Sequence, residues 1–116
     1  MNSKQELFLA YLRHYAAKNL DAVAAMLADD VRLRDWKIVV VGKAAAVHET
    51  AQNFASARSI AIEVLGVYEN QNTVSGELRI VVDGSIELYV VDVIDFNEQG
   101  QIQAIRAYLG RGDCYT

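Results

Sequence analysis

Asp92 stands in the middle of an apolar segment, residues 86–97, and it is the side chain in this sequence that most needs a chemical explanation. Side chains alternate between the two faces of a strand, so the face that carries Asp92 also carries Val90 and Ile94. An ionised carboxylate is costly to bury without a partner, and burial raises the pKa of an isolated carboxyl group. The position therefore favours either an acid that stays protonated or an ion pair with Arg106 on the next predicted strand.

Tyr11 and Asp35 also fall on predicted apolar faces. Asp35 shares one face of the segment VRLRDW, residues 31–36, with a valine and a leucine, and Tyr11 lies on the apolar stripe of residues 2–17. Both have ordinary structural explanations, because tyrosines on such stripes are usually core residues and aspartates at strand ends are usually turn residues. If Tyr11, Asp35 and Asp92 face one cavity, they provide a hydroxyl and two carboxyl groups for acid–base chemistry.

Other kinds of chemistry have weaker support in the sequence. His14 and His48 fall on different predicted helices and lack the spacing of metal ligands. The sequence also contains no phosphate-binding glycine loop and no nucleophile elbow. We therefore expect neither a metal site nor an organic cofactor.

The composition narrows the class of protein. The chain has 116 residues, of which 53% are hydrophobic and 22% are charged, and this predicts a single globular domain over residues 1–116. A net charge of -4 argues against nucleic acid as a partner, and no apolar run approaches the ~20 residues that span a membrane. The N-terminal segment lacks the pattern of a secretion signal, and the single cysteine, Cys114, allows no internal disulfide. We expect a cytoplasmic protein.

The elements that must position these residues follow from hydrophobic periodicity. Helices are predicted at residues 2–17, from an N-cap at Asn19 to Asp29 and Asp30, and at residues 43–55. Short strands are predicted at residues 31–36 and 37–42, followed by four long strands at residues 59–70, 73–83, 85–97 and 101–110. Helices that precede an antiparallel meander are typical of the α+β class.

This order predicts three helices packed on one side of a curved sheet, which leaves a cone with a cavity at its open end. The tightest turn is predicted at residues 83–84, because Asp-Gly is a strong hairpin signal. The other side of the sheet would then expose an apolar run made by Tyr89, Val91 and Val93. Large exposed apolar patches usually mark an interface, so we expect a homodimer through the sheet.

The segments LDAVAAMLADDVRLRD and FNEQGQIQAIRAYLG, together with the three polar positions, resemble the nuclear-transport-factor-2-like, or SnoaL-like, superfamily. Within that group the chain is most similar to the Δ5-3-ketosteroid isomerases, over residues 6–112. The resemblance implies a cone in which three N-terminal helices pack on a curved, mostly antiparallel sheet. It also implies a small hydrophobic substrate and no cofactor.

The resemblance assigns roles to the three polar residues. Tyr11 matches a tyrosine of the first helix that donates a hydrogen bond to the substrate's carbonyl oxygen. Asp35 matches the aspartate base that lies five residues beyond the double aspartate, and Asp92 matches a protonated aspartate that is the second donor. The implied activity moves a proton along a β,γ-unsaturated ketone through a dienolate. The residues expected to contact the substrate are Tyr15, Trp36, Phe54, Val90 and Tyr108.

Two features of the sequence differ from the isomerases and keep other functions open. Trp36 stands where the isomerases usually have proline, and the segment from Asp35 to Gly42 is about two residues short. This segment helps to roof the pocket and so affects the size of the substrate. The alternatives are a SnoaL-like polyketide cyclase, an epoxide-opening hydrolase, and a non-catalytic protein that binds a hydrophobic ligand.

Overall fold

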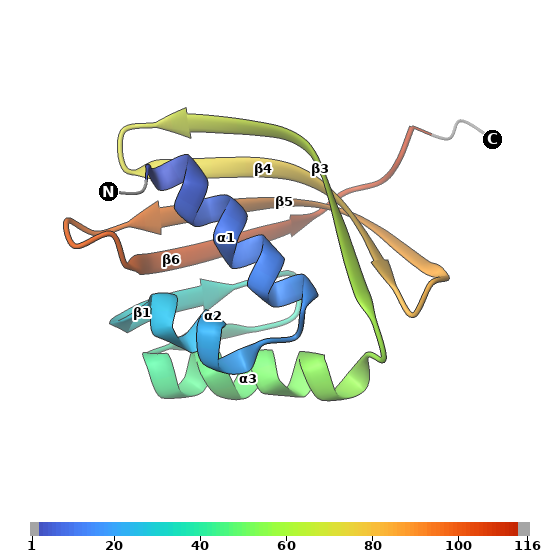
Figure 1. Cartoon of the computed structure of the whole chain (residues 1–116), viewed down its shortest axis with the longest axis horizontal. Coiled ribbons are helices and arrows are strands. Elements are labelled where there is room, and N and C mark those ends of the chain that lie inside the picture. The colour runs from blue at the N-terminus through green and yellow to red at the C-terminus, as the bar shows by residue number, and fades with distance from the viewer. Residues whose placement is uncertain (1–2, 114–116) are drawn as a thin grey trace.

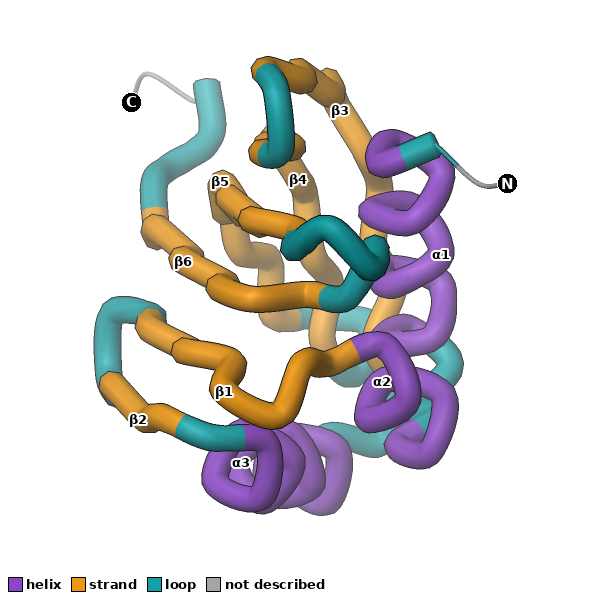
Figure 2. Tube along the Cα trace, turned by 90° about the vertical axis from the view of Figure 1, so that its left-hand side faces the viewer, coloured by secondary structure: helices purple, strands orange, loops and turns teal. Residues whose placement is uncertain are grey.

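Three helices pack against one side of a single curved sheet, as Figures 1 and 2 show in two perpendicular views. The structure is a computed structural model that describes residues 3–113, so Cys114 lies outside the described residues. The elements in chain order are α1 Lys4–Ala16, α2 Leu20–Met26, β1 Leu27–Arg34, β2 Val39–Val41, α3 Lys43–Ser56, β3 Ile60–Asn70, β4 Thr73–Val82, β5 Ile86–Phe96 and β6 Ile102–Leu109. The predicted α+β class and the predicted order of elements are confirmed.

The first two helices begin at polar caps that satisfy free backbone amides. Ser3 and Glu6 form a reciprocal capping box at the start of α1, and the Asn19 side chain accepts a hydrogen bond from the third residue of α2. The expectation that Asp29 and Asp30 end the second helix is wrong, because β1 already begins at Leu27. Leu27 is fully buried and pairs with β6, so the chain leaves the helix before the two aspartates.

The strand order in the sheet is β2-β1-β6-β5-β4-β3. All neighbours are antiparallel except β1 and β6, which run parallel, so the sheet is mostly antiparallel as expected. Asp83 and Gly84 both have positive φ angles, 55° and 74°, and join β4 to β5 in the predicted hairpin. All helices of residues 3–113 lie on one face of the sheet, and none of them covers the other face (Figure 2).

A close contact between α1 and β4 sets the distance between the first helix and the sheet. Phe8 is fully buried, and its ring lies 2.6 Å from the place where a Cβ atom on Gly76 would stand. Only glycine leaves room for this approach. Gly76 also pairs with Asp92 on β5, so the contact holds α1 over the part of the sheet that carries this carboxyl group.

None of the helices in residues 3–113 has the length and apolar character that crossing a membrane requires.

Candidate active site

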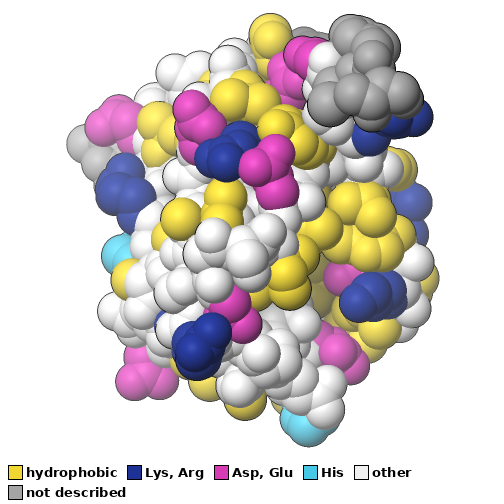
Figure 3. Space-filling view, turned by 90° about the vertical axis from the view of Figure 1, so that its right-hand side faces the viewer, with side chains coloured by type: hydrophobic (Ala, Val, Ile, Leu, Met, Phe, Trp, Pro, Cys, Tyr) yellow, Lys and Arg dark blue, Asp and Glu magenta, His cyan; other side chains and the backbone are white. Residues whose placement is uncertain are grey.

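A cavity of about 320 Å³ lies between α1, α3, the β1–β2 connection and the inner face of the sheet. Its volume is at the low end of the range of ~300–1,000 Å³ that is usual for small-molecule sites. Figure 3 faces the end of the molecule at which the β4–β5 hairpin and the end of α3 lie, where hydrophobic side chains surround a hollow. The polar residues that line the cavity include Tyr11, Tyr15, Asp35, Asn53 and Asp92.

Asp92 lies on the inner face of β5 and lines the cavity, as its predicted face requires. Its neighbours across the sheet are Gly76 and Ala107, whose small side chains leave space beside the carboxyl group. Asp92 is half-buried, and its carboxyl group makes no hydrogen bond within residues 3–113. Burial raises the pKa of Asp92 to about 7, so this group keeps its proton far more readily than a free aspartate does.

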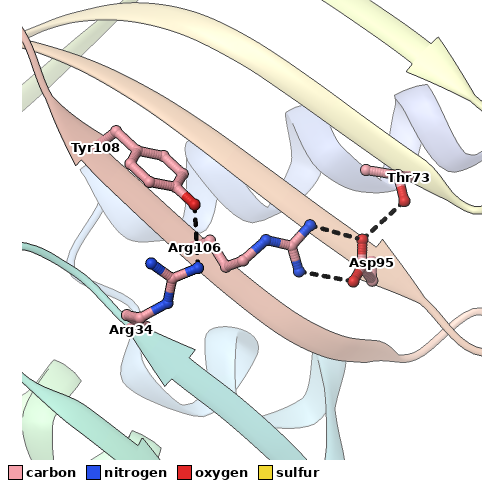
Figure 4. Close-up of polar contacts among 5 residues, drawn as sticks. All are labelled: Arg34, Thr73, Asp95, Arg106 and Tyr108. Atoms are coloured by element: carbon pink, nitrogen blue, oxygen red, sulfur yellow. Dashed lines mark hydrogen bonds and ion pairs between the residues drawn. The ribbon is translucent and has the colours of Figure 1, made fainter.

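The ion pair considered for Asp92 forms at a different aspartate. Arg106 binds Asp95 through two hydrogen bonds of 2.7 and 3.2 Å, and Thr73 donates a third to the same carboxylate (Figure 4). These residues lie on the outer face of the sheet, whereas Asp92 faces the cavity. The arginine lowers the pKa of Asp95, while Asp92 has only burial acting on it. Pairing with Arg106 is therefore excluded as the explanation of Asp92.

Tyr11 reaches the cavity from α1 and is 5% exposed. Its hydroxyl group makes no hydrogen bond within the described residues. Burial, and to a smaller extent the nearby Tyr15 and Asp92, raise the pKa of Tyr11 well above its usual range. The phenol therefore stays protonated and can donate to a ligand in the cavity.

Asp35 is both a turn residue and a residue of the cavity wall, the two possibilities that its place in the sequence suggested. Its Oδ1 atom accepts hydrogen bonds from the backbone amides of Lys37 and Ile38, at 2.7 and 2.9 Å, and so closes the tight turn that follows β1. The same side chain also lines the cavity. Its Oδ2 atom makes no hydrogen bond to any residue that the structure describes, which leaves this oxygen to accept a proton.

The residues expected to contact the substrate divide into two groups. Tyr15, Trp36 and Val90 line the cavity. Phe54 lies behind the wall, where its ring packs edge-on against Tyr15 with 4.9 Å between the centroids. Tyr108 lies on the outer face of the sheet, where it is 46% exposed and accepts a hydrogen bond from Arg34 (Figure 4). The structure therefore brings neither Phe54 nor Tyr108 to the surface of the cavity.

A polar stripe on α3 also lines the cavity, although it was not among the predicted site residues. Glu49, Thr50, Asn53 and Ser56 all line the cavity. The spacing of these residues in the sequence could have indicated a shared face, because residues three, four and seven apart lie on the same side of a helix. On an alanine-rich helix such a stripe looks like a solvent-facing surface.

The site thus brings the Tyr11 hydroxyl group and the carboxyl groups of Asp92 and Asp35 to one largely apolar cavity. Tyr11 and Asp92 can both donate to one oxygen atom of a ligand, and Asp35 can remove or return a proton nearby. Among residues 3–113, no group of three or more His, Cys, Asp or Glu side chains could hold a metal ion.

An α+β cone with a cavity at its open end defines a structural class, and comparison of the sequence with family models identifies it. A model described as "SnoaL-like domain" matches residues 8–105, so the chain belongs to the SnoaL-like family, within the nuclear-transport-factor-2-like fold. No curated protein matches the chain.

Solved structures with the same fold cover nearly the whole chain. A nuclear-transport-factor-2-like protein of unknown function from Cytophaga hutchinsonii is 14% identical with a TM-score of 0.80, covering 95% of this chain and 92% of that one. The epoxide hydrolase/cyclase-like enzyme SalBIII, described for pyran ring formation in the polyether salinomycin, is 20% identical with a TM-score of 0.81, covering 92% and 90%. A protein from Kribbella flavida with a provisional assignment as a ketosteroid isomerase is 15% identical with a TM-score of 0.82, covering 97% and 82%. These similarities show the fold.

Proposed function

We propose that this protein is an acid–base enzyme that moves a proton along an unsaturated ketone by way of an enolate, in the manner of ketosteroid isomerases. The observation that supports this most is the pair of donors at the cavity wall. Tyr11 and Asp92 both face the cavity without hydrogen-bond partners among the described residues; burial raises the pKa of Tyr11 well above its usual range and that of Asp92 to about 7, so both hold their protons more tightly than free side chains do. No fully buried side-chain oxygen or nitrogen among the described residues lacks a partner, so these two groups are open to the cavity, where a ligand oxygen can accept from them.

The two donors would stabilise the negative charge that develops on the ketone oxygen. A carbon acid next to a carbonyl group loses its proton readily only if the resulting enolate is stabilised. Preorganised donors in a water-poor site provide this, and each is worth about 3–4 kcal/mol in other enzymes. Asp92 can donate only in its protonated form, and its apolar surroundings favour that form.

Asp35 would act as the base in the same cycle. Its Oδ2 atom takes the proton from the carbon between the carbonyl group and the alkene, and the electron pair moves onto the ketone oxygen. The same carboxyl group then returns the proton to the far end of the conjugated system, which gives the α,β-unsaturated ketone. The bonds to the amides of Lys37 and Ile38 hold Oδ1 and thereby orient Oδ2. The proton balance closes without a co-reactant.

The experiment is an ultraviolet assay for the conjugated enone that forms from a β,γ-unsaturated 3-ketosteroid. We expect turnover by the wild-type protein and a loss of at least about 10²- to 10⁴-fold in kcat for Asp35→Asn. The asparagine oxygen can still accept the two backbone amides, so this variant should stay folded. Turnover by Asp35→Asn at the wild-type rate would show that another group is the base.

A second function, ring opening of an epoxide, has one observation in its favour. The cavity is small and is closed at one side by the tight turn at Asp35, which suits a compact substrate better than a steroid. In this reaction Asp92 protonates the epoxide oxygen while Asp35 removes a proton from the attacking hydroxyl group. Formation of a diol or cyclic ether from an epoxide probe, with no isomerisation of the ketosteroid, would favour it.

A further inference from the structure

The wall of the cavity is divided by polarity. The sheet contributes mainly aliphatic side chains, among them Ile60, Ile80, Val82, Leu88 and Val90. The opposite wall, made by α3 and the end of α1, contributes Glu49, Asn53, Ser56 and Tyr15. A ligand that fills the cavity therefore meets apolar atoms along one edge and oxygen and nitrogen atoms along the other.

Most hydroxyl protons of the polar wall are already used. The Thr50 hydroxyl donates to the backbone oxygen of Ala46 at 2.8 Å, and the Ser56 hydroxyl donates to the backbone oxygen of Asn53 at 2.9 Å. Tyr15 differs from these two residues. Its hydroxyl oxygen accepts a hydrogen bond of 3.1 Å from the Asn53 amide, so its own proton has no acceptor within residues 3–113.

Tyr15 is held as a protonated donor. Burial raises the pKa of Tyr15, and the hydrogen bond from Asn53 opposes this only in part. The ring is fixed on its other side by the edge-on contact with Phe54, at 4.9 Å between the centroids. A fixed ring with an unused proton is preorganised for binding an acceptor.

The position of Tyr15 separates it from the two donors of the proposed reaction. Tyr15 follows Tyr11 by one helical turn, and their ring centroids are 5.9 Å apart. Tyr15 lies in the last turn of α1, and the C-terminal end of α1 points toward the end of the molecule at which the β4–β5 hairpin lies (Figure 1). The 5.9 Å between the two rings is enough for each hydroxyl group to meet a separate oxygen of one ligand.

We propose that Tyr15 and Asn53 bind a second oxygen of the substrate, about one helical turn (~6 Å) from the reacting carbonyl group. The proposal rests on the proposed function for the position of the first oxygen. Tyr15 donates to the second oxygen, and Oδ1 of Asn53 accepts from it where it is a hydroxyl group. The cavity lining includes both Glu49 and Lys37, so it favours neither an anion nor a cation. The substrate class is a neutral carbonyl compound with one aliphatic edge and a keto, ether or hydroxyl oxygen on the other.

The test compares naphthols as ligands, because a single phenolic oxygen imitates the enolate oxygen. Fluorescence titration gives the Kd of 2-naphthol and of the dihydroxynaphthalenes that carry one hydroxyl group on each ring. We expect at least one dihydroxynaphthalene to bind about five- to tenfold more tightly than 2-naphthol, since a net hydrogen bond contributes ~1 kcal/mol.

Two variants test whether this gain comes from Tyr15 and Asn53. Tyr15→Phe removes the donor, and Asn53→Asp supplies a carboxylate that only accepts and so takes the Tyr15 proton. In both variants the ratio of the Kd of 2-naphthol to the Kd of the best dihydroxynaphthalene should fall to about one. Tyr68→Phe, at a tyrosine that is 63% exposed, is the matched control and should keep the gain. Near-ultraviolet circular dichroism confirms the fold of each variant.

The outcomes separate this inference from the proposed function. The inference is overturned if no dihydroxynaphthalene gains affinity, or if Tyr15→Phe weakens 2-naphthol as much as the dihydroxy ligands. Failure of the proposed function has a different signature, in which the Kd of 2-naphthol is unchanged by Tyr11→Phe. A gain that is lost in Tyr15→Phe would support the second oxygen site even then.

Discussion

Two aspartates line one cavity but differ in their hydrogen bonds, and the proposed function depends on this difference. Asp92 has small neighbours and no hydrogen-bond partner among the described residues, so burial alone acts on its pKa. Asp35 accepts hydrogen bonds from two backbone amides through its Oδ1 atom. Pairs of titratable groups whose environments differ in this way are a common source of acid and base in enzymes. We therefore propose Asp92 as the donor and Asp35 as the acceptor.

The pKa of Asp92 makes a prediction about stability. The native state binds a proton until about pH 7, whereas the unfolded chain releases it near ~3.9. The group thus contributes stability that is fully present below ~3.9 and is lost as the pH rises to about 7. Asp92→Asn cannot ionise, so its free energy of unfolding should fall less over this pH interval than that of the wild type. Urea unfolding at a series of pH values measures the difference, and parallel curves would contradict the prediction.

The sequence could predict these residues only in part. Alternation along β5 placed Asp92 on the inner face, and the resemblance to the isomerases placed Tyr11 and Asp35. Alternation along β6 says that Ala107 and Tyr108 face opposite sides, but not which of them faces the cavity. That choice depends on the pairing of β6 with its neighbours, so the expectation that Tyr108 contacts the substrate had no local basis.

At the scale of elements, local patterns identified the helices and strands, whereas their pairing and some of their ends depend on distant residues. The N-cap at Asn19 and the Asp83 turn are local signals, and both are present. The parallel pairing of β1 with β6 joins segments about 75 residues apart and has no local signal. The same pairing starts β1 at Leu27, earlier than the helical pattern suggests.

The contact between α1 and β4 fixes the helix that carries Tyr11, and this close contact is possible because residue 76 of β4 is a glycine. A Cβ atom at Gly76 would lie 2.6 Å from the buried ring of Phe8, which cannot move into solvent. We expect Gly76→Ala to reduce the free energy of unfolding by about 1–3 kcal/mol through overpacking. Gly110→Ala is the control, because its Cβ would meet only a backbone oxygen at 3.6 Å. Equal stability of the two variants in urea would show that α1 adapts freely.

At the scale of the whole molecule, the outer face of the sheet stands out because no helix of residues 3–113 packs against it. Val91, Tyr108 and Tyr68 are 39%, 46% and 63% exposed there. Arginines gather on the β1–β6 side, and glutamates gather on β3, β4 and β5, where Arg79 pairs with Glu63 and Glu87. A two-fold axis along the strands would place the basic side of one copy on the acidic side of the other.

We therefore expect a homodimer through the outer face. Val91 lies near the centre of the sheet, and Val91→Glu would bury an unpaired charge in such an interface. This variant should have the mass of a monomer in light scattering at micromolar concentration, while the wild type has the mass of a dimer. Gln52→Glu adds the same charge on an exposed part of α3 and should remain dimeric. A monomeric wild type would contradict the expectation.

The central claim is that Asp92 is a protonated donor in a cavity that it shares with Tyr11 and Asp35. The most direct measurement is a pH titration of the Asp92 carboxyl carbon by NMR in the folded protein, with Asp92→Asn used to assign the signal. Burial without a charged partner predicts a midpoint at about 7. A midpoint at or below the ~3.9 of a free aspartate would mean that Asp92 is ionised at neutral pH, and it would contradict both the donor role and the enolate mechanism.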